Sequence, residues 1–511
     1  MKKRSVPQSN SSTVSMTPKR RLWIGTLSFA FSFGLVFAGL GAANAHLGTI
    51  QSFLTTHWNT LYVEVLTNQA MANEKALDLQ TSVPTPHMAF NQIGFVSHEI
   101  LPQTPAETTF EKVASVARED ILKDPMNRIS QDFKVPAGLE KRTQFWFDIY
   151  TKHDAYTHVV HHVRYPWIVY KIIDIRPMVE SGKGPYWLRK DRAEKFAKAE
   201  RNRIAKSLKR LAQRTSYKKL PADEAELYKI LEQVKGKRRA VLKMAAANIR
   251  SQLGQKDFFV NGLKNSGRYL PYMEEEFAQL GVPTELTRIP FVESSFNEKA
   301  VSKVGASGIW QIMPLTGKAY LKIDNTVDER NSPLKATVVA AKLFKSYNKS
   351  LKSWPLTVTS YNHGIGNIQK AIKKAKSRDL TEIIDRYHQG DFKFASSNFF
   401  TCFLAALHAE KYHDVLFIEV EREKLLERKI YTLTSNVTIN TLKKSLNLTT
   451  ADILAYNQDL AIAAKKNITL RRGFTLHLPP GHEQKLLERI GVSDKKPDKR
   501  ASSDTKRKRS A

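Results

Sequence analysis

Residues 272 to about 420 carry a helical pattern of apolar residues throughout, and this long stretch limits the possible folds more than any other feature. Helices that follow one another without intervening strands pack as a mainly α domain. The only cysteine, Cys402, lies in an apolar run, so no internal disulfide can form and the thiol is expected to be a buried small hydrophobe. With 511 residues and 41% hydrophobic content, the chain has room for roughly three or four domains. We therefore expect a mainly α protein with more than one core.

One glutamate, Glu293, is predicted to lie on the apolar side of a helix that starts near Pro283. Leu286 and Ile289 precede it at helical spacing, so the three side chains share a face. Burial disfavours the charged form of a carboxylate, so such a group can keep its proton near neutral pH and deliver it to a leaving oxygen. A structural glutamate paired with a neighbouring arginine is equally compatible with this helix alone.

The N-terminus carries the parts of an export signal in their usual order. Basic residues at positions 2–4 and 19–21 precede the apolar stretch 22–40, which is followed by Ala43-Asn44-Ala45. This order predicts a secretory signal peptide removed after Ala45, and export to the periplasm or cell envelope. The alternative is an uncleaved membrane anchor, because the apolar run is about long enough to span a bilayer.

A net charge of +32 ordinarily suggests nucleic acid as a partner, because clustered Lys and Arg bind phosphates without regard to sequence. The predicted export argues against nucleic acid. Outside a cell membrane, the same charge is able to attract anionic cell-wall polymers or an anionic membrane surface. A solubilising charge bias without a dedicated partner is the alternative.

The region before the long helical stretch is mixed in pattern. Residues 143–150, 158–163 and 167–174 are rich in β-branched and aromatic residues, so two or three strands are expected there. His158, His161 and His162 have no acidic residue or cysteine at a ligand-like spacing beside them. Ordinary strand histidines are therefore expected, and no metal site.

Two helices are predicted to follow these strands. Residues 187–213 place apolar side chains at near-helical spacing among many Lys and Arg, which is typical of an exposed amphipathic helix. This helix either binds an anionic surface or presents a solvated face. A second helix is expected from residue 223 to about residue 249.

Polar side chains and glycines recur in short motifs after Glu293. In the stretch 302–314, two glycines let the backbone approach a neighbour, and Ser307, Gln311 and Met313 are expected to face a groove. Tyr361 and Asn362 end a predicted helix just before Gly364. A buried tyrosine hydroxyl and a side-chain amide are suited to orient a polar substrate or the acid itself.

Taken together, these motifs are more specific than any one of them. The sequence contains, in order, Glu293-Ser-Ser-Phe296, Gly305-Ala-Ser-Gly-Ile-Trp-Gln-Ile-Met-Pro314, Asp328-Glu-Arg-Asn-Ser-Pro333 and Ser360-Tyr-Asn-His-Gly364. Their order and spacing resemble the SLT-type catalytic domain of lytic transglycosylases over residues 265 to about 415. The upstream segment 262–271 is similar to the entry segment of that group.

The resemblance implies a lysozyme-like α-helical fold with Glu293 as the catalytic acid. It places Ser307, Gln311, Tyr361 and Asn362 on motif positions that line the family's glycan groove. It implies no metal and no organic cofactor. The chain departs from the family at His363, where a small residue is commoner.

No second carboxylate is motif-matched to a catalytic role, and this bears on the reaction. Most glycosidases, lysozyme among them, use two carboxylates, one as acid and one as base or nucleophile. A lone acid suffices if the sugar's own C6 hydroxyl is the nucleophile. Together with this lone acid, the resemblance implies cleavage of the MurNAc–GlcNAc β-1,4 bond of peptidoglycan with formation of a 1,6-anhydro end. A hydrolytic muramidase and a non-catalytic peptidoglycan-binding scaffold are the alternatives.

Residues 431–478 resemble a LysM module with the coarse order strand, helix, helix, strand. The matching positions are Thr438, Ile439, Leu442, Leu446, Leu448, Ile453, Tyr456, Asn457 and Gly473. Asn436 and Val437 stand where the module usually has glycine and an acidic residue. The resemblance implies binding to peptidoglycan glycan strands, and a purely structural βααβ cap is the alternative.

The sequence thus predicts a mainly α chain in five parts. These are a signal peptide or anchor (1–45), a helical or mixed region of unknown role (46–260), a lysozyme-like catalytic domain (261–420), a LysM-like module (430–480) and a disordered basic tail (491–511).

Overall fold

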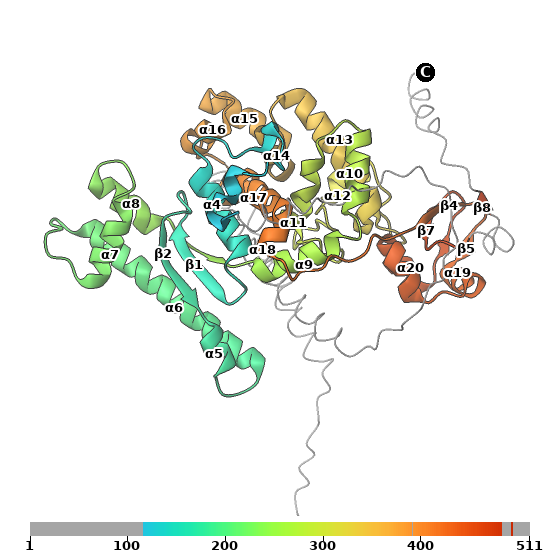
Figure 1. Cartoon of the computed structure of the whole chain (residues 1–511), viewed down its shortest axis with the longest axis horizontal. Coiled ribbons are helices and arrows are strands. Elements are labelled where there is room, and N and C mark those ends of the chain that lie inside the picture. The colour runs from blue at the N-terminus through green and yellow to red at the C-terminus, as the bar shows by residue number, and fades with distance from the viewer. Residues whose placement is uncertain (1–115, 391, 483–491, 494–511) are drawn as a thin grey trace, which may run out of the picture. The chain divides into compact units, whose positions relative to one another are not determined.

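The computed structural model describes residues 116–390, 392–482 and 492–493 (Figure 1). The predicted export signal lies outside the described residues. Within them, no helix combines the length and the apolar character that crossing a membrane requires. Of the predicted basic tail, Val492–Ser493 form the short strand β8, and the other residues lie outside the described part of the chain.

The prediction of a mainly α fold is confirmed. The largest group of buried residues runs from Ile121 to Phe417 and is built almost entirely from helices. The longer helices that contribute to it are α4 (Glu140–Thr151), α9 (Lys256–Ser266), α10 (Leu270–Gln279), α13 (Pro333–Leu351), α14 (Trp354–His363), α15 (Ile365–Ala375), α16 (Leu380–Arg386) and α17 (Phe394–Lys411). The shorter elements are η1 (Arg118–Lys123), η2 (Gln131–Phe133), η3 (Thr284–Arg288), α11 (Ile289–Glu293), α12 (Pro314–Lys318), η4 (Glu329–Asn331) and α18 (His413–Leu416).

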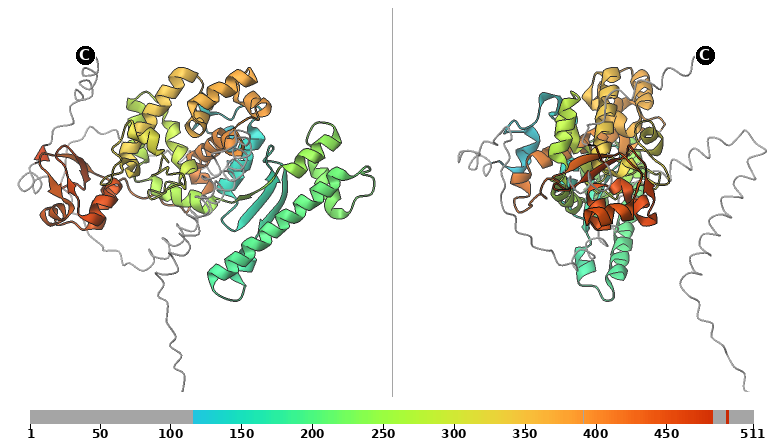
Figure 2. Two further views of the ribbon diagram at one scale, coloured as in Figure 1. Left: turned by 180° about the vertical axis from the view of Figure 1, so that it is seen from behind. Right: turned by 90° about the vertical axis from the view of Figure 1, so that its right-hand side faces the viewer.

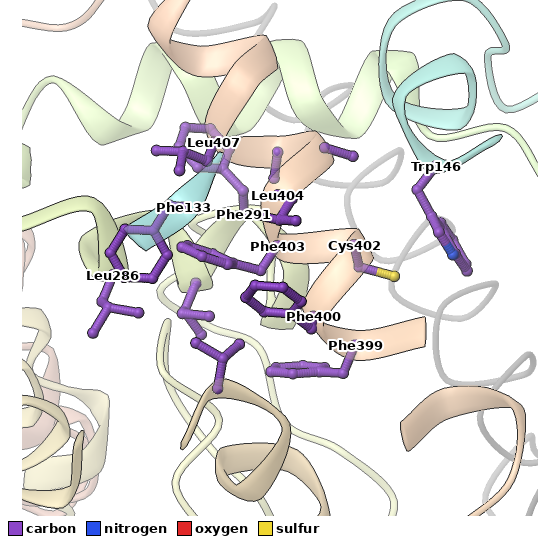
Figure 3. Packing of buried hydrophobic residues seen from close by; sticks show 14 of the residues in the cluster. Phe133, Trp146, Leu286, Phe291, Phe399, Phe400, Cys402, Phe403, Leu404 and Leu407 are labelled. Atoms are coloured by element: carbon purple, nitrogen blue, oxygen red, sulfur yellow. The ribbon is translucent and has the colours of Figure 1, made fainter. Parts of the chain in front are cut away.

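Helix α17 is the centre of this core. Nearly all of its residues are buried, and Phe403, Leu404 and Leu407 have no exposed surface. A helix of this kind is stable only when other elements surround it, and α17 packs against α4, α11 and α14. Figure 3 shows its aromatic and aliphatic side chains together with Phe133, Trp146, Leu286 and Phe291 from other elements of the core. Cys402 is buried in the same helix, as the sequence predicted.

The strand predicted at residues 143–150 is wrong, because these residues belong to helix α4. Most of this helix is buried, including the polar side chains Arg142 and Thr143. A helix enclosed by its neighbours lacks a polar stripe, so its aromatic and β-branched residues have the composition of a strand.

Residues 157–253 form an insertion between α4 and α9, with a separate group of buried residues. Three antiparallel strands pair in the order β2–β1–β3. The elements are β1 (Thr157–His162), β2 (Val169–Asp174), α5 (Arg176–Glu180), α6 (Tyr186–Gln213), α7 (Ala222–Leu231), α8 (Arg238–Ala247) and β3 (Ile249–Leu253). Figure 2 shows from behind that the long helix α6 runs beside the sheet and the shorter helices. The predicted strands at 158–163 and 167–174 and the amphipathic helix at 187–213 are confirmed.

The single helix predicted from residue 223 to residue 249 is wrong. The chain forms two helices, α7 and α8, separated by residues 232–237, and then continues into strand β3. Both helices bury apolar side chains in the core of the insertion, so the apolar spacing continues across the break and hides it in the sequence.

Residues 429–478 form a small module with its own buried residues. Its elements are β4 (Lys429–Leu433), β5 (Val437–Thr438), α19 (Ile439–Leu446), α20 (Thr450–Tyr456), η5 (Gln458–Leu460), α21 (Ala461–Lys466), β6 (Thr469–Leu470) and β7 (Thr475–Leu478). Strand β4 pairs with β7 and β8, and β5 pairs with β6. The expected βααβ order is present, with the additional helix α21 before the last strands. Asn457 ties α20 to β7, since its side chain donates to the carbonyl of His477 (2.6 Å) and accepts from the amide of His477 (2.8 Å).

The positions of the domain boundaries remain predictions. The described residues before 260 nevertheless have two different surroundings. Ile121 to Val159 belong to the same buried group as the helices around α17, whereas most of the insertion has its own.

Candidate active site

Glu293 is the last residue of α11, a short helix that continues the 3-10 helix η3. The predicted start at Pro283 is correct, but the first turn is 3-10 rather than α. Leu286 and Ile289 are fully buried, while Glu293 keeps part of its surface exposed. The two apolar residues therefore fix the helix in the core, and the carboxyl group lies at its boundary.

The turn after Glu293 is unusual. Ser295 and Phe296 both adopt positive φ, at 51° and 53°, which non-glycine residues rarely do. Phe296 is fully buried and packs edge-on against Phe291, with 4.7 Å between ring centroids. Gly262 of α9 allows the turn to come close, because a Cβ there would lie 2.9 Å from the carbonyl oxygen of Ser295. The chain therefore reverses sharply next to the carboxyl group and is held there by packing.

Burial raises the pKa of Glu293 from 4.5 to about 8. No Lys or Arg among the described residues forms an ion pair with it, and desolvation is the only cause of the shift. The alternative of a structural glutamate satisfied by an arginine is therefore not supported. A carboxyl group with this pKa carries a proton at neutral pH and is able to act as a general acid.

We expect the raised pKa to appear in the pH dependence of stability. Between the ordinary pKa and about 8, only the folded chain keeps this proton, so this group's contribution to stability falls as pH rises. Glu293→Gln removes the titration. The free energy of unfolding of the variant should equal that of the wild type near pH 4.5. At pH 8–9 it should be higher than that of the wild type by on the order of a few kcal/mol. Thermal unfolding of both proteins across this range tests this. A constant difference at all pH values would mean that the pKa of Glu293 is not raised.

The loop from Val301 to Met313 forms the next part of the site. Isolated bridges pair Ser307 with Val301 and with Ile312, so the loop is folded back on itself. Gly308 has a positive φ of 75°, and a Cβ at this position would lie 2.1 Å from the carbonyl oxygen of Arg330. Only glycine fits this approach.

Arg330 clamps this loop from the motif at 328–333. Its guanidinium donates to the carbonyls of Gly305 (2.5 Å) and Ile312 (3.1 Å) and is held by Asp328 at 2.7 Å. The sequence alone does not indicate a role for Arg330, although the residue lies within the motif at 328–333. An arginine beside an acidic residue is a weak signal, and only the fold shows that its guanidinium reaches the loop carbonyls.

Two consecutive carbonyls of this loop bring Glu293 and Tyr361 to one place. The hydroxyl of Ser294, the residue after Glu293, donates to the carbonyl of Ile309 (2.8 Å). The hydroxyl of Tyr361, on α14, donates to the carbonyl of Trp310 (2.8 Å). Burial raises the pKa of Tyr361 well above its ordinary value, and the charge of Glu293 adds to the rise. Tyr361 therefore remains a neutral phenol within electrostatic reach of the acid.

Asn362, the residue after Tyr361, is positioned by α17. Its side-chain oxygen accepts from the hydroxyl of Ser396 at 3.3 Å, and the same hydroxyl lies 2.9 Å from Nδ1 of His363. The ring of His363 packs edge-on against Phe392, with 5.3 Å between centroids. His363, at which the chain departs from the family motif, is thus accommodated by Ser396 and Phe392. Ser396 carried no sequence signal, because it lies in an otherwise apolar run.

The other predicted substrate-binding residues have different surroundings. Ser307 is 2% exposed, and its hydroxyl donates to the side chain of Asn331 (2.6 Å). Gln311 is partly buried with a positive φ of 47°, and its amide nitrogen donates to the carbonyls of Ala300 and Gly308. Met313 is 41% exposed. Ser307 thus has an internal role in shaping the loop, while Met313 is open to a ligand, and direct contact of any of them with substrate remains a prediction.

No group of three or more metal-ligating side chains occurs in the part of the chain that the structure describes. His161 and His162 lie in β1 and are fully buried, and burial lowers their pKa values to about 3 and about 4. The ring of His161 packs between Phe145 and Phe394. These two histidines are therefore neutral members of the core.

Comparison with known proteins identifies the segment that contains this arrangement. Residues 273–384 match the family described as Transglycosylase SLT domain. Membrane-bound lytic murein transglycosylase D of Escherichia coli K12 is 38% identical over 112 residues, which are 22% of this chain and 25% of the relative, and the protein of the same name from strain CFT073 gives the same values. A putative tributyltin chloride resistance protein of Alteromonas sp. strain M-1 is 30% identical over 112 residues, 54% of that protein.

The match spans about a quarter of the length of the first two relatives and about half of the third. The resemblance of the motifs to lytic transglycosylases is confirmed over this segment. The LysM resemblance of residues 431–478 remains a prediction.

Proposed function

We propose that this chain, whose residues 273–384 form a transglycosylase SLT domain, is a lytic transglycosylase that cleaves the MurNAc–GlcNAc β-1,4 bond of peptidoglycan. The observation that carries the proposal is the position of Glu293: no described Lys or Arg pairs with its carboxyl group, burial raises its pKa to about 8, and Tyr361 lies within electrostatic reach. The relatives named as lytic murein transglycosylases support murein as the substrate.

Glu293 acts twice in the proposed reaction. It first donates its proton to the glycosidic oxygen, so the bond to C1 breaks and the GlcNAc hydroxyl leaves. The resulting carboxylate then takes the proton of the MurNAc C6 hydroxyl, whose oxygen attacks C1 and closes the 1,6-anhydro ring. The proton count balances, Glu293 ends protonated, and no water is consumed. The C6 hydroxyl is tethered to the reacting sugar, so its effective concentration is high.

The surroundings of nearby carboxylates favour this route over hydrolysis. Glu298 accepts hydrogen bonds from Tyr269, from Arg268 (3.0 Å) and from Gln458 (2.8 Å). A carboxylate that accepts from three donors is held in place by them and is not free to orient an attacking water. Asp328 is similarly bound by Arg330. A muramidase needs a second carboxylate as base or nucleophile, and these two are already held by other partners.

We further propose that the module at residues 429–478 holds the enzyme on peptidoglycan. The proposal rests on the LysM-like fold of this module, in which the motif residues Thr438 and Asn457 have structural roles: the Thr438 hydroxyl caps α19 by accepting from the amide of Thr441, and Asn457 joins α20 to β7. The protein would act in the cell envelope, as the name of the E. coli relatives suggests.

The products formed in water enriched in oxygen-18 test the proposed reaction. The purified chain is incubated with peptidoglycan, and the released muropeptides are identified by mass spectrometry. We expect products lighter by one water, with 1,6-anhydro ends and no incorporated label. Hydrated reducing ends that carry the label would establish the muramidase instead. Retention of the chain on peptidoglycan without any released product would establish a non-catalytic binding protein.

A further inference from the structure

The insertion at residues 157–253 is not used by the proposed reaction. It precedes the matched segment 273–384 and contains none of the motif residues. It carries 24 Lys and Arg against nine Asp and Glu, so it supplies about half of the net charge of the whole chain. A strongly basic unit with its own core requires a separate explanation.

Part of this charge lies along one side of α6. This 28-residue helix buries Ala197, Ile204 and Leu208 in the core of the insertion. Its opposite side is exposed and basic, with Arg192, Lys195, Lys198, Lys206, Lys209 and Arg210. At 1.5 Å per residue the helix is about 42 Å long, so the basic side forms an extended stripe.

Part of this stripe has no acidic partner. Lys195 pairs with Asp191 (2.7 Å), and Arg210 pairs with Glu224 (2.9 Å). Lys198, Lys206 and Lys209 form no ion pair with any described residue. Like charges kept side by side repel one another, and an anionic partner would relieve this repulsion.

Large apolar side chains are exposed where α6 begins. Trp187 is 68% exposed, and Met178 of the adjoining helix α5 is 38% exposed. In Figure 1, α5 lies beside the first turns of α6. Arg189 fastens α5 to α6 by donating to the carbonyls of Glu180 (3.4 Å) and Gly182 (3.3 Å). An exposed tryptophan at one end of a helix that carries a row of unpaired lysines is a combination suited to the interface of an anionic bilayer.

We propose that the exposed side of α6, with Trp187 at its start, docks on a membrane surface rich in anionic phospholipid. The lysines supply the attraction to the headgroups, and Trp187 enters the interfacial layer. An extended stripe on the outside of a helix fits a flat surface better than it fits the ends of a glycan strand. This inference does not depend on the proposed reaction, because its measurement is binding to lipid.

Binding of the full chain to sedimented vesicles tests the inference. Vesicles of phosphatidylglycerol and phosphatidylethanolamine are compared with vesicles of phosphatidylcholine at physiological salt. The variant Lys198→Gln/Lys206→Gln/Lys209→Gln should bind the anionic vesicles about 10²-fold more weakly, given a contribution of about 1 kcal/mol per lysine. The control Lys229→Gln/Lys235→Gln/Lys243→Gln removes the same charge from exposed positions elsewhere in the insertion and should change binding less than threefold. Trp187→Ser should weaken binding about tenfold and leave circular dichroism unchanged.

Three results would overturn the inference. The first is equal binding of the wild type to the two kinds of vesicle. The second is a control variant that loses as much binding as the α6 variant, which would make the effect one of net charge. The third is binding of a soluble polyanion such as DNA to the α6 stripe while anionic vesicles do not bind, which would assign the stripe to a different class of partner.

Discussion

Glu293→Gln is expected to lower turnover of peptidoglycan by about 10²–10⁴-fold, the usual contribution of a general acid or base. The loss should lie toward the upper end of this range, because in the proposed reaction the same carboxyl group gives the first proton and takes the second. Glutamine keeps the size of the protonated acid but cannot transfer a proton. The Michaelis constant should change little, since the neutral amide resembles the protonation state that burial already favours in the folded chain.

The matched control is Glu285→Gln, the same chemical change on the 3-10 helix that precedes α11. Among the described residues, Glu285 accepts one long hydrogen bond, from the amide of Ser130 (3.3 Å), so its variant should retain nearly full activity. The pH profile gives a second readout. Since Glu293 must be protonated at the start, kcat/KM of the wild type should fall as pH rises through about 8. Full activity of Glu293→Gln, with products unchanged, would remove Glu293 from the mechanism.

The raised pKa of Glu293 is predictable from the sequence because its cause is local. Leu286 and Ile289 at helical spacing place Glu293 on an apolar face, and apolar surroundings are what raise its pKa. Tyr361 and Asn362 stand out by their position just before a glycine at the end of a helix. The hydrogen bonds that position them are not predictable, because Trp310 and Ser396 are distant in sequence.

The wrong predictions of secondary structure have a common physical origin. The apolar pattern reports burial, and it reports secondary structure only when one side of an element is exposed. Helix α4 is enclosed by the core, and its residues have the composition of a strand. Helix α6 has one solvent-exposed side, and the sequence predicts its bounds almost to the residue. The break between α7 and α8 is hidden for the same reason, because the apolar spacing runs on across it. The apolar pattern also cannot predict the ion pairs that hold the start of α11, because their acidic partners lie in two other helices, α10 and α17.

That support is a buried ion-pair network around Arg288, the residue before α11. Arg288 is 3% exposed, and its guanidinium contacts Glu274 of α10 and Glu410 of α17, the latter at 2.7 Å. Glu410 is also bound by Arg422 at 2.6 Å. Burial would by itself raise the pKa of Glu410, but the charges of Arg288 and Arg422 outweigh it and lower the pKa to about 2. The network therefore ties the helix that ends in Glu293 to the central helix of the core.

Arg288→Met should lower the free energy of unfolding by about 3–5 kcal/mol at pH 7, because it leaves Glu410 buried with one cation fewer. The control Arg386→Met breaks an exposed pair with Glu382 and should cost at most about 1 kcal/mol. A carboxylate with a depressed pKa stabilises the folded chain above its unfolded pKa, and this stabilisation is lost as pH falls toward the folded value. The difference between wild type and Arg288→Met should therefore narrow between about pH 4.5 and pH 2. Thermal unfolding of the two proteins at several pH values measures this difference in stability. A difference that stays constant over this range would mean that the variant loses packing rather than charge, and Glu410 would then not depend on Arg288.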